Sequence, residues 1–405
     1  MQASPVYQKL AEKFVFKKSW DDVIVPDSLL KIVAFLFTEE EAEIVEKLSF
    51  LGSPARMIAR KVKRPLAEVE PILKSLSDRA LIVGLKVKGM QVYGFLGMAP
   101  GIFEAQMVIS RGEKGEYFRE FARLFEDFYA EFFTWLKPQV EGKDMRLGRI
   151  ISIEKAIDQT PGLNILAFDT DLYSEIIDRN KSFCNVNVCS CRHQADLVGK
   201  WCGKPKDVCC GMGLLADIAI DKGWARRVDK KEFLEIKVRA ADAGLVNMVD
   251  NLANPMQMCS CCGDCCGALR ILTEFNIPTI VTQSHFEAEV DPAKCKGCGT
   301  CAKFCPMKAI QVVNKKAEVN LMRCIGCGVC VYKCEKNRGV SMKERPNYKP
   351  PAEGVVDFAV GRYFELKGRE ETFFPKLSLG AGRLLSQVFP AISGPRYKPG
   401  SISGK

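Results

Sequence analysis

The distribution of cysteine constrains this chain more than any other feature of its sequence. All nineteen cysteines of the 405 residues lie between Cys184 and Cys334, so the first 183 residues contain none. A secreted disulfide scaffold would be short and would follow an apolar signal segment, whereas residues 1–20 are charged and amphipathic. We therefore expect a cytoplasmic protein in a reducing compartment, in which clustered thiols bind metal or carry out redox chemistry.

Two runs near the C-terminal end share the cysteine spacing C-x-x-C-x-x-C-x-x-x-C. They consist of Cys295, Cys298, Cys301 and Cys305, and of Cys324, Cys327, Cys330 and Cys334. Bacterial ferredoxins with two [4Fe–4S] clusters repeat this spacing, and the fourth cysteine of each run binds the other cluster. The pattern predicts one cluster on Cys295, Cys298, Cys301 and Cys334, and a second on Cys324, Cys327, Cys330 and Cys305. A pair of zinc sites is the alternative, and the twin runs of four disfavour it.

Glycines and flanking residues support this interpretation of the two runs. Each run contains two glycines, which let the backbone approach the inorganic sulfides of a cluster. These glycines are Gly297, Gly299, Gly326 and Gly328. Val290 and Val319 precede the runs and are expected to end paired strands, and each fourth cysteine is expected to open a helix. Glu335 stands where proline usually follows the last cysteine, which is a departure from the ferredoxin pattern.

Eleven further cysteines lie between Cys184 and Cys266, a density that buried structural cysteines do not explain. Several are adjacent pairs, and neighbouring cysteines rarely bind one zinc ion together. We expect at least one further iron–sulfur cluster, with one member of each pair as a ligand, although the number and type of central centres stay open. His193 is expected to be a hydrogen-bonding residue. The candidate ligands are Cys189, Cys191, Cys202, Cys209, Cys259, Cys261, Cys262, Cys265 and Cys266.

The cysteine-free half contains a helix, helix, helix, hairpin order that is typical of a winged helix-turn-helix. The expected helices are 38–48, a second that Ser53 caps, and 65–79, followed by strands in 81–95 around a Lys88-Gly89 turn. Glu68 and Glu70 lie where a DNA-reading helix would need basic side chains, which favours a scaffold over an operator-binding domain. An aromatic-rich helix over 116–136 is expected to be core or a subunit seam.

With these motifs in place, the chain resembles a family of largely uncharacterised 4Fe–4S dicluster proteins of anaerobic bacteria and archaea. Besides the two runs, the resemblance rests on Met98-Ala-Pro-Gly-Ile-Phe-Glu104, on Cys189-Ser-Cys191-Arg192 and on residues 259–267. Related sequences often have cysteine where Asp264 stands, so one ligand is missing or replaced here. The resemblance implies an anaerobic electron carrier or a reductase subunit and names no substrate.

The expected fold class is a multidomain α+β protein. We expect a winged-helix-like domain with the aromatic helix in 1–137, a cysteine-rich α/β domain in 145–284, a two-cluster ferredoxin-like domain in 285–345 and a tail in 346–405. A length of 405 residues is more than one core usually organises. No stretch approaches the roughly 18 apolar residues of a transmembrane helix.

The predicted function is electron transfer through two [4Fe–4S] clusters, to or from the central cysteine-rich site or a redox partner protein. The alternatives are a reductase with catalysis at the central site, and a redox-sensing DNA-binding regulator. The net charge of +10 omits the negative charge of bound clusters, so a nucleic-acid partner is possible but not favoured. The sequence gives no indication of the oligomeric state.

Overall fold

The computed structural model describes residues 4–15, 24–50, 52–87, 89–141, 143, 145–160, 162–163, 172–334, 338–346, 348 and 351. The chain forms two compact units, one of Met1–Gln139 with Asn187–Cys202 and one of Val140–Val186 with Gly203–Lys405. Almost all of the predicted tail, 346–405, lies outside the described residues. Among the helices in the described ranges, none is long and apolar enough to cross a membrane.

The first unit is mainly helical and has one small sheet. Strands β1 (Ser53–Pro54), β2 (Val83–Val87) and β3 (Met90–Gly94) pair antiparallel in the order β1-β3-β2. Its helices are α1 (Pro5–Phe14), α2 (Asp27–Leu36), α3 (Glu39–Glu46), α4 (Ala55–Val62), α5 (Leu66–Asp78), α6 (Phe103–Ile109), α7 (Glu116–Gln139) and α10 (Ser190–Leu197).

Three helices and a hairpin occur where the sequence predicts them. Thr38 and Glu41 form a reciprocal capping box that starts α3. The second helix begins differently from the prediction, because Ser53 pairs with Tyr93 in the sheet and Pro54 takes the N-cap position of α4. Strands β2 and β3 form the predicted hairpin.

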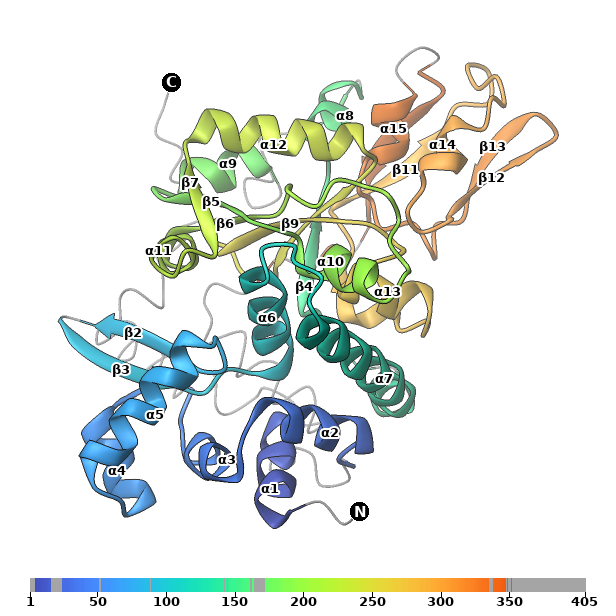
Figure 1. The fold of residues 1–405 in the computed structure, drawn as a ribbon. Helices are drawn as coiled ribbons and strands as arrows, with labels where there is room; N and C mark the ends of the chain where they lie inside the picture. The colour runs from blue at the N-terminus through green and yellow to red at the C-terminus, as the bar shows by residue number, and fades with distance from the viewer. Residues whose placement is uncertain are drawn as a thin grey trace, which may run out of the picture. The chain divides into compact units, whose positions relative to one another are not determined.

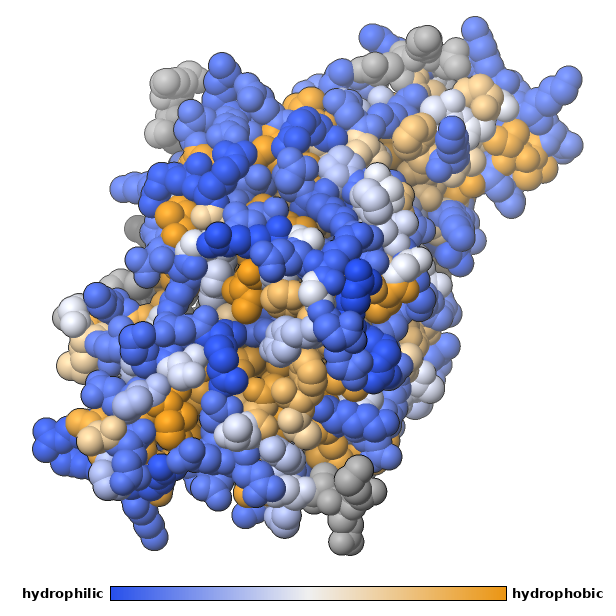
Figure 2. Space-filling model, viewed as in Figure 1, coloured by the Kyte–Doolittle hydropathy of each residue, from blue (hydrophilic) through white to orange (hydrophobic). Residues whose placement is uncertain are grey.

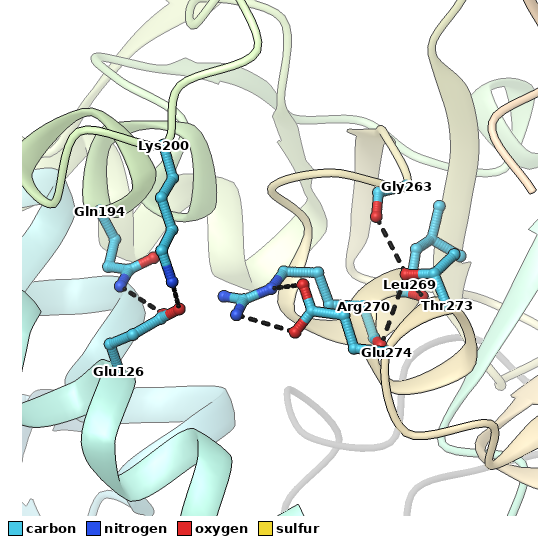
Figure 3. A network of polar contacts seen from close by, with 8 residues as sticks. All are labelled: Glu126, Gln194, Lys200, Gly263, Leu269, Arg270, Thr273 and Glu274. Carbon is cyan, nitrogen blue, oxygen red and sulfur yellow. Dashed lines mark hydrogen bonds and ion pairs between the residues drawn. The ribbon is translucent and has the colours of Figure 1, made fainter.

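The aromatic residues of α7 form core within the first unit, as expected. Phe121 is fully buried, and the ring of Phe125 stacks on Phe103 with 4.0 Å between centroids. The helix extends to Gln139, beyond the predicted range of 116–136, so Pro138 lies inside it. Helix α10 packs here too, because the amide of Gln194 donates to Glu126 at 3.0 Å, as the left side of Figure 3 shows.

The second unit contains a seven-stranded sheet in the order β10-β4-β8-β9-β6-β5-β7. All neighbours are antiparallel except β10 and β4. The strands are β4 (Gly148–Ile151), β5 (Phe183–Val186), β6 (Cys210–Met212), β7 (Ala225–Val228), β8 (Val246–Asp250), β9 (Gln257–Cys261) and β10 (Val281–Thr282). Cysteines therefore lie in three strands of this sheet, β5, β6 and β9.

Helices cover both faces of this sheet (Figure 1). Helix α12 (Lys230–Asp242) lies on one side of the strands, whereas α11 (Gly213–Asp221) and α13 (Gly267–Thr273) lie toward the other. The unit also includes the short helices α8 (Glu154–Asp158) and α9 (Tyr173–Asp178). Because successive side chains of a strand point to opposite faces, the two sides of the sheet carry different cysteines.

The two predicted cysteine runs form a ferredoxin-like part of the second unit. Strand β11 (Phe286–Val290) pairs with β14 (Val340–Glu344), and β12 (Ile310–Val313) pairs with β13 (Lys316–Val319). Helices α14 (Thr300–Phe304) and α15 (Val329–Lys333) end at Cys305 and Cys334. The expectation that each fourth cysteine opens a helix is therefore wrong, because a tight glycine turn starts each helix before the third cysteine.

Hydrogen bonds fasten the second cysteine run to the residues that directly follow β4 of the large sheet. The Ile153 amide donates to the Cys327 carbonyl at 3.1 Å, and the Ser152 hydroxyl donates to the Gly326 carbonyl at 2.6 Å. Arg345 closes the other side of the loop by donating to the Cys324 carbonyl at 3.0 Å. Its guanidinium also forms a buried ion pair with Glu287 at 3.1 Å.

Replacing Arg345 by methionine is expected to lower the thermal unfolding temperature of the protein by roughly 5–10 °C, because breaking a buried ion pair costs about 3 kcal/mol. The loss is at the lower end for buried pairs since Lys343, 3.5 Å from Glu287, stays in place. Lys294→Ala removes the exposed pair with Asp291 and serves as the control, and we expect it to leave the unfolding temperature nearly unchanged. Equal unfolding temperatures for the two variants would contradict this role of Arg345.

Candidate metal centres

Four thiols from the two runs line one cavity of the second unit. They are the predicted ligands of one cluster, Cys305, Cys324, Cys327 and Cys330. Its other walls are mainly apolar, with Met307, Ile310 and Ile325. Cys305 comes from the first run and reaches a cavity that the second run otherwise encloses. A cavity walled by four thiols and apolar side chains fits a buried iron–sulfur cluster.

The remaining four thiols of the runs are electrostatic neighbours of one another. Burial raises the pKa of the Cys301 thiol, and the nearby Cys334, Cys295 and Cys298 raise it further. Burial likewise raises the pKa of Cys327, and there the neighbouring thiols are Cys305 and Cys324. Cys330 interacts electrostatically with thiols of both groups, because Cys301 of the other group also raises the pKa of Cys330. Thiolates are the form that binds iron, and binding therefore releases protons from these sites.

Backbone amides donate to two of these sulfur atoms. The Ala309 amide lies 3.2 Å from Cys305 Sγ, and the Ala317 amide lies 3.3 Å from Cys295 Sγ. Hydrogen bonds to cysteine sulfur stabilise negative charge there and are one of the means by which a protein sets a cluster potential. Each group of four thiols therefore has at least one such bond.

Glycine is required as the second of the two residues between the first and second cysteines of each run. Gly297 and Gly326 have positive φ angles of 67° and 71°, which other residues rarely adopt. A Cβ atom at Gly297 would overlap the Lys315 carbonyl, and one at Gly326 would overlap the Phe286 carbonyl. Gly299 also has a positive φ, of 75°, but a Cβ atom there would meet nothing closer than Val312 Cγ2 at 4.0 Å.

The two groups of thiols differ in their access to solvent. Cys298 is exposed, whereas Cys324, Cys327 and Cys330 are buried. The nearby β12–β13 hairpin presents hydrophobic side chains at the surface (Figure 2), and Val312 on it is 40% exposed. The first group therefore lies near a surface that a partner protein can reach.

Comparison with known families supports this description of the C-terminal part. Residues 287–335 match the family model of the 4Fe-4S dicluster domain. The chain contains a 4Fe–4S dicluster domain. No curated protein and no solved structure matches the chain.

Outside the dicluster domain, four central thiols come together on one face of the large sheet. Cys259 and Cys261 alternate with Ser260 along β9 and share a face. The pairing of Cys210 with Met258 places Cys209 opposite Cys259 on the neighbouring chain segment. Cys266 precedes α13, and its Sγ lies 3.2 Å from Cys261 Sγ. These four thiols, Cys209, Cys259, Cys261 and Cys266, are called the central thiol group below.

The pKa values of the central thiol group reflect its crowding. Hydrogen bonding to Cys209 is the largest cause that raises the pKa of Cys259, and burial adds to it. Hydrogen bonds with Cys259 and Cys266 raise the pKa of Cys261 well above its usual value, again with burial. Such contacts link all four sulfur atoms.

Cys262 and Cys265 form a separate pair next to the dicluster domain. Their Sγ atoms lie within 4.8 Å of each other. Gly263 between them approaches the domain so closely that a Cβ atom there would overlap the Pro306 carbonyl, one residue after Cys305. The Thr273 hydroxyl, from α13, donates to the Gly263 carbonyl at 3.1 Å and fixes this turn, as Figure 3 shows.

Cys184 and Cys210 were not predicted as ligands, and neither belongs to the central thiol group. Cys184 packs in an apolar cluster with Ala216, Ala219 and Ala225, and burial raises its pKa to about 11. Cys210 is buried, and the pKa of its thiol is raised by burial despite the nearby Lys237 ammonium. Strand alternation directs Cys210 and Cys209 to opposite faces of the sheet.

The three remaining candidates, Cys189, Cys191 and Cys202, belong to the first unit. Cys189 is buried at the N-cap of α10, Cys191 lies in that helix, and Cys202 is half-buried. Their role as ligands stays a prediction. His193 is a hydrogen-bonding residue, as expected, because its Nε2 lies 3.1 Å from the Glu113 carbonyl oxygen.

Sequence patterns did not reveal the residues on the α12 side of the sheet. Lys237 is only 2% exposed, and it lines a second pocket together with Tyr173, Asn247 and Tyr332. Burial and the neighbouring carboxylates of Glu154 and Asp158 raise the pKa of Tyr173 to about 12. A single lysine in an amphipathic helix has no sequence pattern that marks it as buried.

Gly297→Ala is expected to remove about four iron atoms per chain, since the new methyl group overlaps a backbone carbonyl and one cluster has four iron atoms. Gly299→Ala is the matched control in the same loop, with positive φ but open space, and we expect nearly full iron content. Iron and acid-labile sulfide in protein purified without oxygen would measure both. Equal iron in the two variants would contradict the steric role of Gly297.

Proposed function

We propose that this chain is an electron-transfer protein whose dicluster domain holds two [4Fe–4S] clusters with exchanged fourth ligands. One set is Cys324, Cys327, Cys330 and Cys305, and the other is Cys295, Cys298, Cys301 and Cys334. The observation that carries the proposal is the cavity in which Cys305 of the first run joins three thiols of the second. Bound [4Fe–4S] clusters supply centres that gain and lose one electron at a time.

The residues around these thiols have defined tasks in this proposal. The amides of Ala309 and Ala317 donate to ligand sulfur atoms and favour their negative charge. The glycine at 326 allows the loop to lie against the Phe286 carbonyl, and Ser152 holds its carbonyl. Apolar side chains form most of the other walls of the cavity. These features favour stable, buried ligation over exchange of metal with solvent.

The two ends of the dicluster domain differ in what each can contact, an external partner or the central cysteines. We propose that an external redox partner docks near Cys298, where the β12–β13 hairpin exposes Val312. The other end contacts the turn of Cys262, Gly263 and Cys265 through Pro306. This contact supports electron exchange with a central cysteine-rich site, and a reductase role for that site is the alternative within the same proposal.

The proposed domain organisation gives the N-terminal half a supporting role. We propose a winged-helix-like region in 1–137 that acts as a scaffold or docking surface, followed by the cysteine-rich part, the dicluster domain and the tail. The basic side chain at the start of α5 is occupied, because Arg64 forms ion pairs with Glu40 at 2.6 Å and Glu68 at 3.1 Å. A guanidinium held by two carboxylates is a weak phosphate ligand, so DNA binding is not favoured.

Two double variants test the exchanged ligand sets directly. Cys295→Ser with Cys334→Ser removes two ligands of one proposed cluster and is expected to cost about four iron atoms per chain. Cys295→Ser with Cys305→Ser removes a ligand from each cluster and is expected to cost about eight. Iron, labile sulfide and low-temperature EPR of the reduced proteins would measure the losses.

The opposite order of losses would show that each run binds its own cluster. Cys184→Ser is the control, because this buried thiol belongs to an apolar cluster with Ala216, Ala219 and Ala225, and the variant is expected to retain all iron. No iron in the parent protein would refute the proposed function altogether.

A further inference from the structure

The central thiol group is a second place in the molecule where metal binding is built into the fold. We propose that Cys209, Cys259, Cys261 and Cys266 together bind one metal centre of the thiophilic class, iron in a cluster or zinc. This site is distinct from the dicluster domain. It includes four of the nine cysteines predicted as central metal ligands.

Sheet geometry brings three of the four ligands together without any help from a metal. The β9 alternation places Cys259 and Cys261 on one face, and the β6–β9 register places Cys209 beside Cys259. The fourth, Cys266, arrives at the start of α13 and contacts Cys261 at 3.2 Å between sulfur atoms. Four thiols from three chain segments are the donor set of tetrathiolate zinc and iron–sulfur sites.

A buried positive charge lies behind this donor set and is the second, independent observation. The Lys237 ammonium donates to the Met258 carbonyl at 2.6 Å and to the Val208 carbonyl at 3.1 Å. These residues immediately precede Cys259 and Cys209. The third donation goes to the Ser260 hydroxyl at 3.1 Å, between the two β9 cysteines.

Lys237 has no carboxylate partner among the described residues, although it is almost fully buried. Burying an ammonium without a counter-charge is costly, so a lysine in this position indicates negative charge nearby. A centre with four thiolates carries net negative charge on a 2+ ion or cluster, and the sheet backbone alone separates it from Lys237. The ammonium and the thiolates therefore complement each other across the sheet.

The neighbouring cysteines fit other roles. Cys210 faces the α12 side, and Cys184 packs among alanines. Cys262 and Cys265 pair with each other at the turn that touches Pro306. This division explains why the sequence contains adjacent cysteines, since one member of the Cys261–Cys262 pair and one of the Cys265–Cys266 pair belong to the central thiol group.

Replacing Lys237 tests the charge argument. Lys237→Gln is expected to weaken metal retention by the central thiol group about 10-fold or more, as for other residues that support metal ligands. Competition with a chelator would measure retention, and Lys231→Gln, an exposed position of the same helix, is the control. Equal metal retention in the two variants would show that Lys237 does not stabilise the bound metal.

Metal analysis of ligand variants tests the site itself. Iron, zinc and labile sulfide are measured per chain in the full-length parent, in Cys261→Ala/Cys266→Ala and in Cys184→Ala, all purified without oxygen. We expect the parent to contain metal beyond the roughly eight iron atoms of two [4Fe–4S] clusters, and the double variant to lose that excess alone. Cys184→Ala is expected to match the parent.

Either excess iron with sulfide or about one zinc ion supports the proposal and identifies the metal. Cys209→Ala, at a half-buried position outside the β9–α13 turn, replaces the double variant if that variant does not fold. No excess metal in the parent, or an excess unchanged in both ligand variants, would overturn the proposal. A parent protein that holds the excess metal but lacks the roughly eight dicluster iron atoms would instead count against the proposed function.

Discussion

The attachment of the cysteine loops to the large sheet is the constraint on which the rest of the second unit depends. Ser152 and Ile153, at the end of β4, bond the Gly326 and Cys327 carbonyls, and Arg345 bonds the Cys324 carbonyl. The loop that must curl around a cluster is thus fixed by protein contacts as well as by its own thiols. Positive-φ glycines then let carbonyls of neighbouring strands approach it. The result is a preorganised cavity with four thiols.

Electrostatic interactions are the second physical feature that shapes the cysteine sites of this unit. Burial raises the pKa of the Cys327 and Cys330 thiols, so the protein interior disfavours their free thiolates and favours neutralisation by metal. On the α12 side of the sheet, Lys237 supplies positive charge directly behind Cys209 and Cys259. The turn at Gly263 places this region in contact with Pro306 of the dicluster domain. The proximity of two cysteine-rich regions within one unit supports the proposed electron-transfer role.

Sequence reasoning located the motifs whose chemistry is local. The two runs were identified from spacing alone, and the family model covers the same segment. The helices and hairpin around 38–95 also follow from caps and periodicity, although Ser53 pairs in a sheet where a cap was expected. The central cysteines could not be sorted in this way. Which of them share a face depends on the β6–β9 register and on α13, and these are long-range contacts that no local pattern encodes.

The most direct measurement of the central claim is low-temperature EPR of the reduced protein, purified without oxygen and with iron and sulfide counted on the same sample. Two [4Fe–4S] clusters on the dicluster thiols predict about eight iron atoms and at least about two unpaired spins per chain, with line shapes broadened by interaction between neighbouring clusters. A chain that contains zinc in place of iron, or a single isolated spin with about four iron atoms, would contradict it.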